Sequence, residues 1–187
     1  SFLNFISASG FLRTNNRIIV NENNEKVILK GFGLGGWTVL EGYMWNAFIE
    51  HASTTNLENA IVDLVGVEKK DQFFELYQKN YITEKDIVFL SEQGFNALRV
   101  PLHYKHFSPS PNVFTNEGFD LLDPIVELCK ENNIYLILDM HAAPGAQNTN
   151  DFSDSDGETA KLFTEYENQV WLASTWRYIA EYYADEP

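Results

Sequence analysis

The fold is decided by the stretch Ile134-Tyr-Leu-Ile-Leu-Asp-Met-His141, which runs into the loop Ala142-Ala-Pro-Gly-Ala-Gln-Asn148. Five apolar or aromatic residues precede its first charge, Asp139. A continuous apolar run of this length is typical of a strand buried on both faces, as parallel strands in α/β proteins are. Ligands of α/β folds bind at the carboxyl ends of the strands. We therefore expect Asp139 and His141 to lie at the edge of a functional site.

A second buried strand is predicted over Phe95-Asn-Ala-Leu-Arg-Val-Pro-Leu-His-Tyr104. Arg99 interrupts its apolar run, and a charge in a buried strand is rare unless an opposite charge pairs with it. We therefore expect a carboxylate opposite Arg99. Its place towards the carboxyl end of the strand favours a role in a site over a purely structural ion pair.

Segments whose apolar residues recur at helical spacing lie between these strands and on either side of them. This spacing predicts helices over 56–66, 68–81, 83–94, 124–133 and 168–183. Thr83 and Asp86 are placed to form a capping box, and Gly94 is placed to end the same helix. Asp123-Pro124 is predicted to be an N-cap followed by the first helical position. The alternation of strands and helices indicates a parallel sheet in a single domain.

The first part of the chain has a different pattern. Residues 1–9 favour only a short lead-in, whereas short β-rich runs between Phe11 and Leu29 are separated by Asn-rich turns and predict a hairpin or small meander. The stretch Lys30-Gly-Phe-Gly-Leu-Gly-Gly-Trp37 lacks both a Gly-Lys-Ser/Thr ending and the G-x-G-x-x-G spacing. We therefore favour glycines that let the backbone approach a ligand or a neighbour over a nucleotide loop.

The 187 residues carry a formal net charge of −14, and 44% of them are hydrophobic. This acidity argues against nucleic acid or an anionic membrane surface as partner, because both require a basic patch. No apolar run approaches the ~20 residues of a membrane span, so no membrane insertion is expected. The single cysteine, Cys129, lies on a helical apolar face, and we expect a buried structural thiol.

Three histidines, His103, His106 and His141, lie at or just after the ends of the two predicted strands. They raise the alternative of a metal site, yet neither an H-x-H nor an H-E-x-x-H pattern is present. A sugar site in which His103 and His141 form hydrogen bonds explains them better, and no metal or other cofactor is expected. Trp37 and Trp45 are candidate platforms for sugar stacking, with core packing as the open alternative.

Three motifs carry a resemblance to a known family. They are Lys30-Gly-Phe-Gly-Leu-Gly-Gly-Trp-Thr-Val-Leu-Glu41, Gly94-Phe-Asn-Ala-Leu-Arg-Val-Pro101 and Leu138-Asp-Met-His-Ala-Ala-Pro-Gly-Ala-Gln-Asn148. In this order they resemble glycoside hydrolase family 5, and most closely its branch of exo-β-1,3-glucanases and related β-glucanases. The similarity covers nearly all of the chain after Phe11. It implies an α/β fold, a (β/α)8 TIM barrel, and a retaining mechanism.

The resemblance also implies roles for individual residues. Arg99 resembles the arginine that hydrogen-bonds the nucleophile, and His141 resembles the histidine that lines the −1 subsite. Glu41 and Tyr43 match positions that contact the non-reducing sugar. The remaining substrate-binding assignments are Trp37, His103, Asn148 and Asp151.

Two departures from the family pattern limit how far these residue roles can be assigned to this chain. The loop over residues 149–156 is longer than that of the family, so the choice between Asp151 and Asp154 as its acidic ligand stays open. His103-Tyr104 replaces a Gly-Tyr-Trp sequence, which leaves exo-1,3 specificity open.

The two catalytic glutamates of the family have no match in the chain. Retaining glycosidases need two carboxylates about 5 Å apart, and the family places them after strands four and seven. Asp185-Glu186-Pro187 follows an amphipathic helix, so we interpret Glu186 as part of the loop entering strand four. We expect residues 1–29 to form a lead-in and β cap and residues 30–187 the first three βα units. Both glutamates are then expected beyond Pro187, and this piece alone is expected to be inactive.

The predicted function is retaining hydrolysis of β-glucosidic bonds in β-glucan or a cellulose-like polysaccharide, in an extracellular or periplasmic compartment. The expected partners are a β-linked oligo- or polysaccharide and the missing C-terminal part of the barrel. Two alternatives remain, a noncatalytic glycan-binding module on the same scaffold and a metal-dependent barrel hydrolase. The linkage, β-1,3 or β-1,4, and the mode of attack, exo or endo, stay open.

Overall fold

The computed structural model describes residues 10–47 and 49–187, so the lead-in predicted over residues 1–9 lies outside the described residues. The chain begins with a small antiparallel sheet of β1 (Arg13–Asn15), β2 (Ile18–Val20) and β3 (Lys26–Val27). Asn16 has a φ of +55° and Asn24 a φ of +66°, the left-handed conformation that asparagine tolerates in tight turns. The predicted meander is therefore confirmed.

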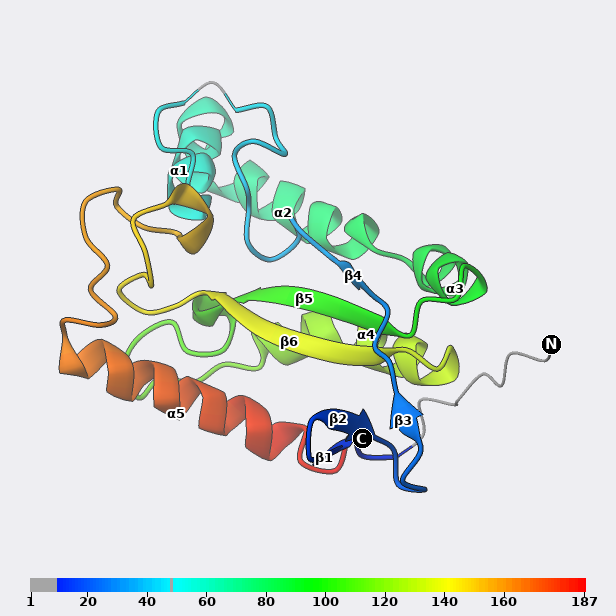
Figure 1. The fold of residues 1–187 in the computed structure, drawn as a ribbon. Helices are drawn as coiled ribbons and strands as arrows, with labels where there is room; N and C mark the ends of the chain where they lie inside the picture. The colour runs from blue at the N-terminus through cyan, green and yellow to red at the C-terminus, as the bar shows by residue number, and fades with distance from the viewer. Residues whose placement is uncertain (1–9, 48) are drawn as a thin grey trace.

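A parallel sheet follows, with β4 (Gly31–Gly33), β5 (Ala97–His103) and β6 (Tyr135–Ala142) in the order β4-β5-β6 (Figure 1). The register places Arg99 between Gly33 and Ile137, and Pro101 beside Asp139. The register shifts between Leu102 and His103, so that His103 lies beside Ala142. Among the described residues, β6 is paired along one edge alone.

Within residues 10–47 and 49–187, five α-helices accompany the sheet. They are α1 (Thr54–Val65), α2 (Val67–Tyr81), α3 (Glu84–Glu92), α4 (Glu117–Glu131) and α5 (Tyr166–Tyr182), with short 3₁₀ helices η1 (Tyr104–His106) and η2 (Asp151–Ser153) after β5 and β6. Figure 1 shows α5 running along the sheet and η2 lying beside α1. The predicted pairing at the start of α3 is confirmed, because the Thr83 N–H donates to Asp86 Oδ2 at 2.8 Å. No helix in the described ranges is both long and apolar enough to cross a bilayer.

The main core lies between one face of the parallel sheet and the helices α3, α4 and α5. Leu98, Val100 and Leu102 of β5 are at most 1% exposed, and they pack with residues of these helices. The helical members of this core are Ile87, Leu90, Phe119, Leu122, Ile125, Cys129 and Ile179. Cys129 is 1% exposed, which confirms the predicted buried thiol, and burial raises its pKa to about 12.

The start of α4 differs from the prediction. The helix begins at Glu117 rather than after Asp123, so Pro124 lies inside it. The buried stripe of Phe119, Leu122 and Ile125 extends through the proline, and its burial outweighs the backbone hydrogen bond that proline cannot make. Asp123 is not a cap, because its carboxylate accepts hydrogen bonds from the Tyr182 hydroxyl at 2.7 Å and the Tyr183 hydroxyl at 2.8 Å.

The burial of β6 also differs from the prediction. The strand was expected to be buried on both faces, yet Ile137 is 42% exposed. Leu136, Leu138 and Met140 alternate with it and pack against the helical core. The helices cover one face alone, and the face that carries Ile137 is left partly open by the described residues. The apolar run therefore does not distinguish a covered face from an open one.

Candidate active site

The open face of the sheet carries a cluster of three polar side chains. His141 lies at the carboxyl end of β6 and Asp139 in the middle of that strand, whereas Arg99 lies in the first half of β5 and not towards its carboxyl end as expected. Arg99 Nη2 forms an ion pair with Asp139 Oδ2 and lies 3.0 Å from His141 Nδ1. His141 Nδ1 is 2.8 Å from the same oxygen of Asp139. The expected carboxylate partner of Arg99 is thus Asp139, from the neighbouring strand. Because the three groups hold one another, the guanidinium and the imidazole have defined positions.

This cluster is accessible, which corrects one expectation. Arg99 was predicted to be a buried charge, yet its side chain is 42% exposed, and those of Asp139 and His141 are 31% and 23% exposed. The residues alternate with the buried side chains of the same strands, so they point away from the helices. The cluster can therefore contact a ligand that lies over the open face.

A second polar group follows the glycine-rich strand β4. Tyr43 donates its hydroxyl to Glu41 Oε2 at 2.6 Å, and this hydrogen bond is the main reason why the pKa of Tyr43 is raised. Glu41 is 9% exposed, whereas Tyr43 is 71% exposed. A Cβ added to Gly35 would lie 2.6 Å from Glu41 Oε1. The prediction that glycine permits close approach is confirmed here, because the Glu41 carboxylate lies against the Gly35 backbone.

Helix α2 fixes the turn that carries Glu41. The Tyr77 hydroxyl donates to the Gly36 carbonyl at 2.6 Å, and the Tyr81 hydroxyl donates to the Gly35 carbonyl. Trp37 Nε1 donates to the Gln78 carbonyl at 2.9 Å, and Trp37 is 3% exposed. Trp37 thus takes the packing role that the sequence left open, and its buried ring offers no stacking surface in this structure.

Trp45 also packs against the protein. Its ring centroid lies 5.2 Å from that of Tyr77 and 5.9 Å from that of Phe73. The two tryptophans therefore support α2 and the turn above it, and the exposed ring near Glu41 is that of Tyr43.

The loop after β6 brings further predicted residues to the site. Asn148 Oδ1 accepts hydrogen bonds from the Asn150 N–H at 2.8 Å and from Ser153 Oγ at 3.0 Å, so this atom shapes the loop. Asp151 contributes to the raised pKa of Tyr43, which places its charge near that hydroxyl. The Phe152 ring lies 5.9 Å from the His141 ring. The loop thus joins the two polar groups.

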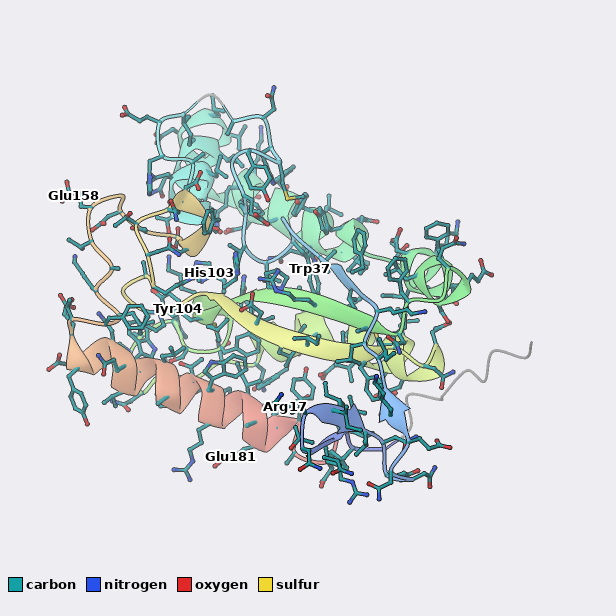
Figure 2. The ribbon with its side chains drawn as sticks, viewed as in Figure 1. Arg17, Trp37, His103, Tyr104, Glu158 and Glu181 are labelled. Atoms are coloured by element: carbon teal, nitrogen blue, oxygen red, sulfur yellow. The ribbon has the colours of Figure 1, made fainter. Side chains whose placement is uncertain are left out.

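His103 does not take the place that the sequence gave it. It is 2% exposed, and its Nε2 lies 2.9 Å from Asp154 Oδ2. Figure 2 shows His103 between the end of β5 and the loop that carries η2. A side chain enclosed in this way cannot reach a sugar directly. Its burial follows from the loop after β6, because Asp154 of that loop lies against the imidazole.

The three histidines pair with different carboxylates. His103 contacts Asp154, His106 Nδ1 lies 3.1 Å from Glu117 Oε1, and His141 contacts Asp139. Over residues 10–47 and 49–187, no group of three histidine, cysteine, aspartate or glutamate side chains is placed to hold a metal ion.

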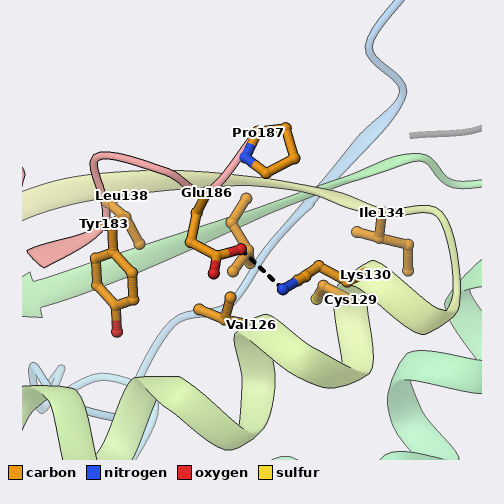
Figure 3. Close-up of a pocket in the computed structure, with 9 residues that line it drawn as sticks. Val126, Cys129, Lys130, Ile134, Leu138, Tyr183, Glu186 and Pro187 are labelled. Atoms are coloured by element: carbon orange, nitrogen blue, oxygen red, sulfur yellow. Dashed lines mark ion pairs between the residues drawn. The ribbon is translucent and has the colours of Figure 1, made fainter. Parts of the chain in front are cut away.

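The contacts of Glu186 are with a different part of the molecule from these polar groups. It forms an ion pair with Lys130 of α4, with Nζ and Oε2 2.9 Å apart (Figure 3). Both residues line a cavity of about 140 Å³ between α4, β6 and the segment after α5. This position agrees with the interpretation of Glu186 as a loop residue.

Several residues of the site were missed by sequence reasoning. Tyr77, Tyr81, Thr55 and Lys105 have positions set by contacts with segments 41 to 99 residues away. Tyr77 and Tyr81 are four residues apart and therefore share one face of α2, which is the one signal the sequence contained.

The arrangement defines an α/β protein with a polar site on the open face of a parallel sheet. Among solved structures, it is similar to rutinosidase from Aspergillus niger, with a TM-score of 0.62 and 21% identity over 78% of this chain and 42% of that chain. It is also similar to a second structure, AoRut, with a TM-score of 0.69 and 21% identity over 84% of this chain and 44% of that chain. These comparisons support a fold of the TIM-barrel type.

Comparison of sequences gives the family. The family model described as cellulase (glycosyl hydrolase family 5) matches residues 51–187, and the chain belongs to glycosyl hydrolase family 5. A β-xylosidase of Phanerodontia chrysosporium is 34% identical over 180 residues, which are 94% of this chain and 37% of that protein. A probable glucan 1,3-β-glucosidase A of Emericella nidulans is 31% identical over 135 residues, which are 71% of this chain and 33% of that protein. The chain spans about a third of the length of these relatives.

Proposed function

We propose that the intact protein is a retaining β-glycoside hydrolase that acts on β-glucosidic bonds of a β-glucan or a cellulose-like polysaccharide outside the cell. The observation that carries this proposal is the accessible cluster of Arg99, Asp139 and His141, in which His141 lies at the carboxyl end of β6. This is the edge at which barrel enzymes assemble their catalytic groups. Membership of glycosyl hydrolase family 5 supports the reaction class.

Arg99 has the chemistry required to support a carboxylate nucleophile. A guanidinium close to a carboxylate favours the ionised form, which is the form that attacks the anomeric carbon. The ion pair with Asp139 orients the guanidinium, and the 42% exposed side chain leaves donors for a second carboxylate. His141 donates its Nδ1–H to Asp139, so its Nε2 is left to accept a hydrogen bond from a sugar hydroxyl.

Glu41, Tyr43 and Asp151 are proposed to hold the hydroxyl groups of the non-reducing sugar. Carboxylates accept hydrogen bonds from sugar hydroxyls, and the exposed Tyr43 ring supplies an apolar face as well. Asn148 belongs to the same loop and is proposed to contribute through its amide nitrogen. Trp37 and His103 are proposed to act through the residues that they support, because both are buried.

The acid/base and nucleophile glutamates are proposed to lie in further sequence that completes the barrel. Two observations support this step. Among the described residues β6 has an unpaired edge on which a fourth strand can add, and the chain spans about a third of the length of the relatives named above. Parallel strands with an open edge are incomplete as a barrel, which needs eight.

The test uses the full-length protein and soluble β-1,3-glucan, β-1,4-glucan and β-xyloside substrates, the last because of the β-xylosidase relative. We expect release of sugar with the β-anomer formed first, detected by proton NMR, as retention requires. Inverted product would contradict the retaining mechanism. Saccharide binding without any product would support a noncatalytic glycan-binding module instead, and loss of activity on chelation would support a metal-dependent hydrolase.

A pair of arginine variants tests the role of the cluster. Arg99→Ala is expected to lower kcat/KM by about 10²-fold or more, because it removes a charge that is already oriented towards the reacting groups. Arg177→Ala is the matched control, since Arg177 lies on the exposed side of α5 and, in the part of the chain that the structure describes, pairs with Glu181 alone. Equal activity of the two variants would remove Arg99 from the catalytic machinery.

A further inference from the structure

We infer that Asp154 and His103 are positioning residues, which lock the loop over residues 148–156 so that Asp151 and Phe152 face the sugar site. The inference rests on the proposed function, and it assigns the two acidic residues of the loop to different tasks. Asp151 is the residue that meets the substrate, and Asp154 holds the loop that presents it.

The Asp154 carboxylate joins three separate segments of the chain. Its Oδ1 accepts the Thr55 N–H at 2.7 Å, at the start of α1. Its Oδ2 accepts from Thr55 Oγ1 at 2.8 Å, from His103 Nε2 at 2.9 Å and from Lys105 Nζ at 3.0 Å. With four donors on it and a side chain that is only 5% exposed, this carboxylate is enclosed by protein and turned away from a sugar.

His103 takes a single tautomer in this latch, which we define as Thr55, His103, Lys105 and Asp154. The Lys105 backbone N–H donates to His103 Nδ1 at 3.2 Å, so Nδ1 is the acceptor. The proton therefore sits on Nε2, which donates to Asp154. Burial lowers the pKa of His103 to about 4, so the imidazole is neutral over the range in which most proteins work. A neutral ring donates one hydrogen bond of fixed direction.

Other contacts fix the loop on both sides of Asp154. His51 Nε2 lies 2.6 Å from the Ser155 carbonyl, and Ser153 Oγ donates to the Asn148 carbonyl at 3.0 Å. Ser153 and Ser155 are at most 3% exposed. Asp154 itself has a φ of +53°, a conformation that costs energy for a residue other than glycine and persists where surrounding contacts hold it.

The locked loop presents two side chains towards the polar groups of the site. Asp151 Oδ1 accepts the Phe152 N–H at 2.9 Å, and over the described ranges its other oxygen has no protein partner. Its charge acts on Tyr43, which itself donates to Glu41. The Phe152 ring lies 5.9 Å from the His141 ring. Phe152 thus lies beside His141 of the Arg99 cluster, and Asp151, the preceding residue, brings its charge near Tyr43.

The first experiment is a double-mutant cycle in the full-length enzyme, with the best substrate from the panel above. Asp154→Asn and Asp151→Asn are each expected to raise KM about tenfold. Asp151→Asn weakens the hydrogen bonds of Asp151 to the sugar, and Asp154→Asn releases the loop that positions Asp151. If Asp154 acts through Asp151, the double variant is no worse than Asp151→Asn alone. Effects that multiply in the double variant would overturn the inference.

Matched variants separate positioning from stability. Asp156→Asn is the control in the same region, because the Asp156 side chain is 51% exposed and lies outside the latch. It is expected to leave KM unchanged. His103→Gln retains an amide N–H towards Asp154 and is expected to keep KM within about threefold, whereas His103→Leu is expected to match Asp154→Asn. A lower melting temperature with unchanged KM in Asp154→Asn would mean that the latch is only structural.

Amide hydrogen exchange gives a readout that does not depend on catalysis. Residues 148–156 are expected to exchange at least tenfold faster in Asp154→Asn than in the unmodified protein, with β5 unchanged. Unchanged exchange in this loop would overturn the inference about Asp154 and His103 and would leave the proposed function standing. Absence of hydrolysis by the unmodified enzyme on every substrate would instead remove the proposed function, so the two failures are distinguishable.

Discussion

The two faces of the parallel sheet are built from the same strands and have opposite tasks. On the helical face, Leu98, Val100 and Leu102 are at most 1% exposed and form the centre of the core. On the open face, the Arg99 side chain is 42% exposed and Ile137 is 42% exposed. Since side chains alternate along a strand, one short sequence supplies stability to one face and chemistry to the other. Mutations on adjacent residues should therefore have different consequences.

The largest expected effect is on the free energy of unfolding, which should differ between variants of the two faces. Leu98→Ala should lower the free energy of unfolding by about 2–5 kcal/mol, because it leaves a cavity among close-packed side chains. Ile137→Ala, on the open face, should cost less than about 1.5 kcal/mol, since part of its surface already contacts water. Urea unfolding measures both. Similar losses from the two variants would show that the open face is covered in the intact protein.

The pH dependence of stability tests His103, which lies at the junction between the two faces. Its pKa is lowered to about 4, whereas the unfolded chain has an ordinary value near 6.5. The unfolded state therefore binds a proton first as the pH falls, and stability decreases between about pH 6.5 and pH 4. We expect a loss of about 1–2 kcal/mol between pH 7 and pH 5. His103→Gln should remove this component, and an unchanged pH profile in that variant would contradict the assignment.

A smaller effect is expected from the glycine turn on the open side. Gly35→Ala places a methyl group 2.6 Å from Glu41 Oε1, so the carboxylate must move. We expect kcat/KM to fall about three- to tenfold, equivalent to roughly 1 kcal/mol, in the proposed hydrolase. Gly31→Ala is the control, because its added methyl group would lie at an ordinary 3.4 Å from Ala97. A larger loss from Gly31→Ala would contradict the importance of the Glu41 position.

The smallest effect is expected on the outer surface of α5. Arg177 and Glu181 form an i,i+4 pair with side chains that are 79% and 63% exposed. Arg177→Ala should change the free energy of unfolding by no more than about 0.5 kcal/mol, because exposed pairs are screened by solvent. A melting temperature more than a few degrees lower would indicate an unrecognised contact of this surface.

Local patterns were enough to predict most elements of the fold. The strands β5 and β6, the pairing of Thr83 with Asp86 and the termination near Gly94 all depend on neighbours within a few residues. The start of α4 was predicted wrongly because Asp123-Pro124 is a strong local signal for an N-cap. In the structure, Asp123 instead accepts hydrogen bonds from Tyr182 and Tyr183. These residues lie about 60 residues later, at the end of α5.

The site was predictable in its residue types and less so in its contacts. A partner for Arg99 was expected from charge alone, and the register of β5 and β6 selects Asp139. The latch could not be predicted, because it joins Thr55 and Asp154, which are 99 residues apart in the chain. The burial of His103 depends on its contact with Asp154, 51 residues later in the chain, which sequence periodicity does not contain.

The cavity between α4 and β6 has a consequence for measurement. Cys129, the single thiol of the chain, is part of its wall and is 1% exposed, with a pKa that burial raises to about 12. A thiol in this state reacts with alkylating reagents only after the wall opens and water reaches the sulfur. The rate at which the protein gains the mass of one adduct therefore counts the separations of α4 from β6. Cys129 therefore reports that motion without an engineered cysteine.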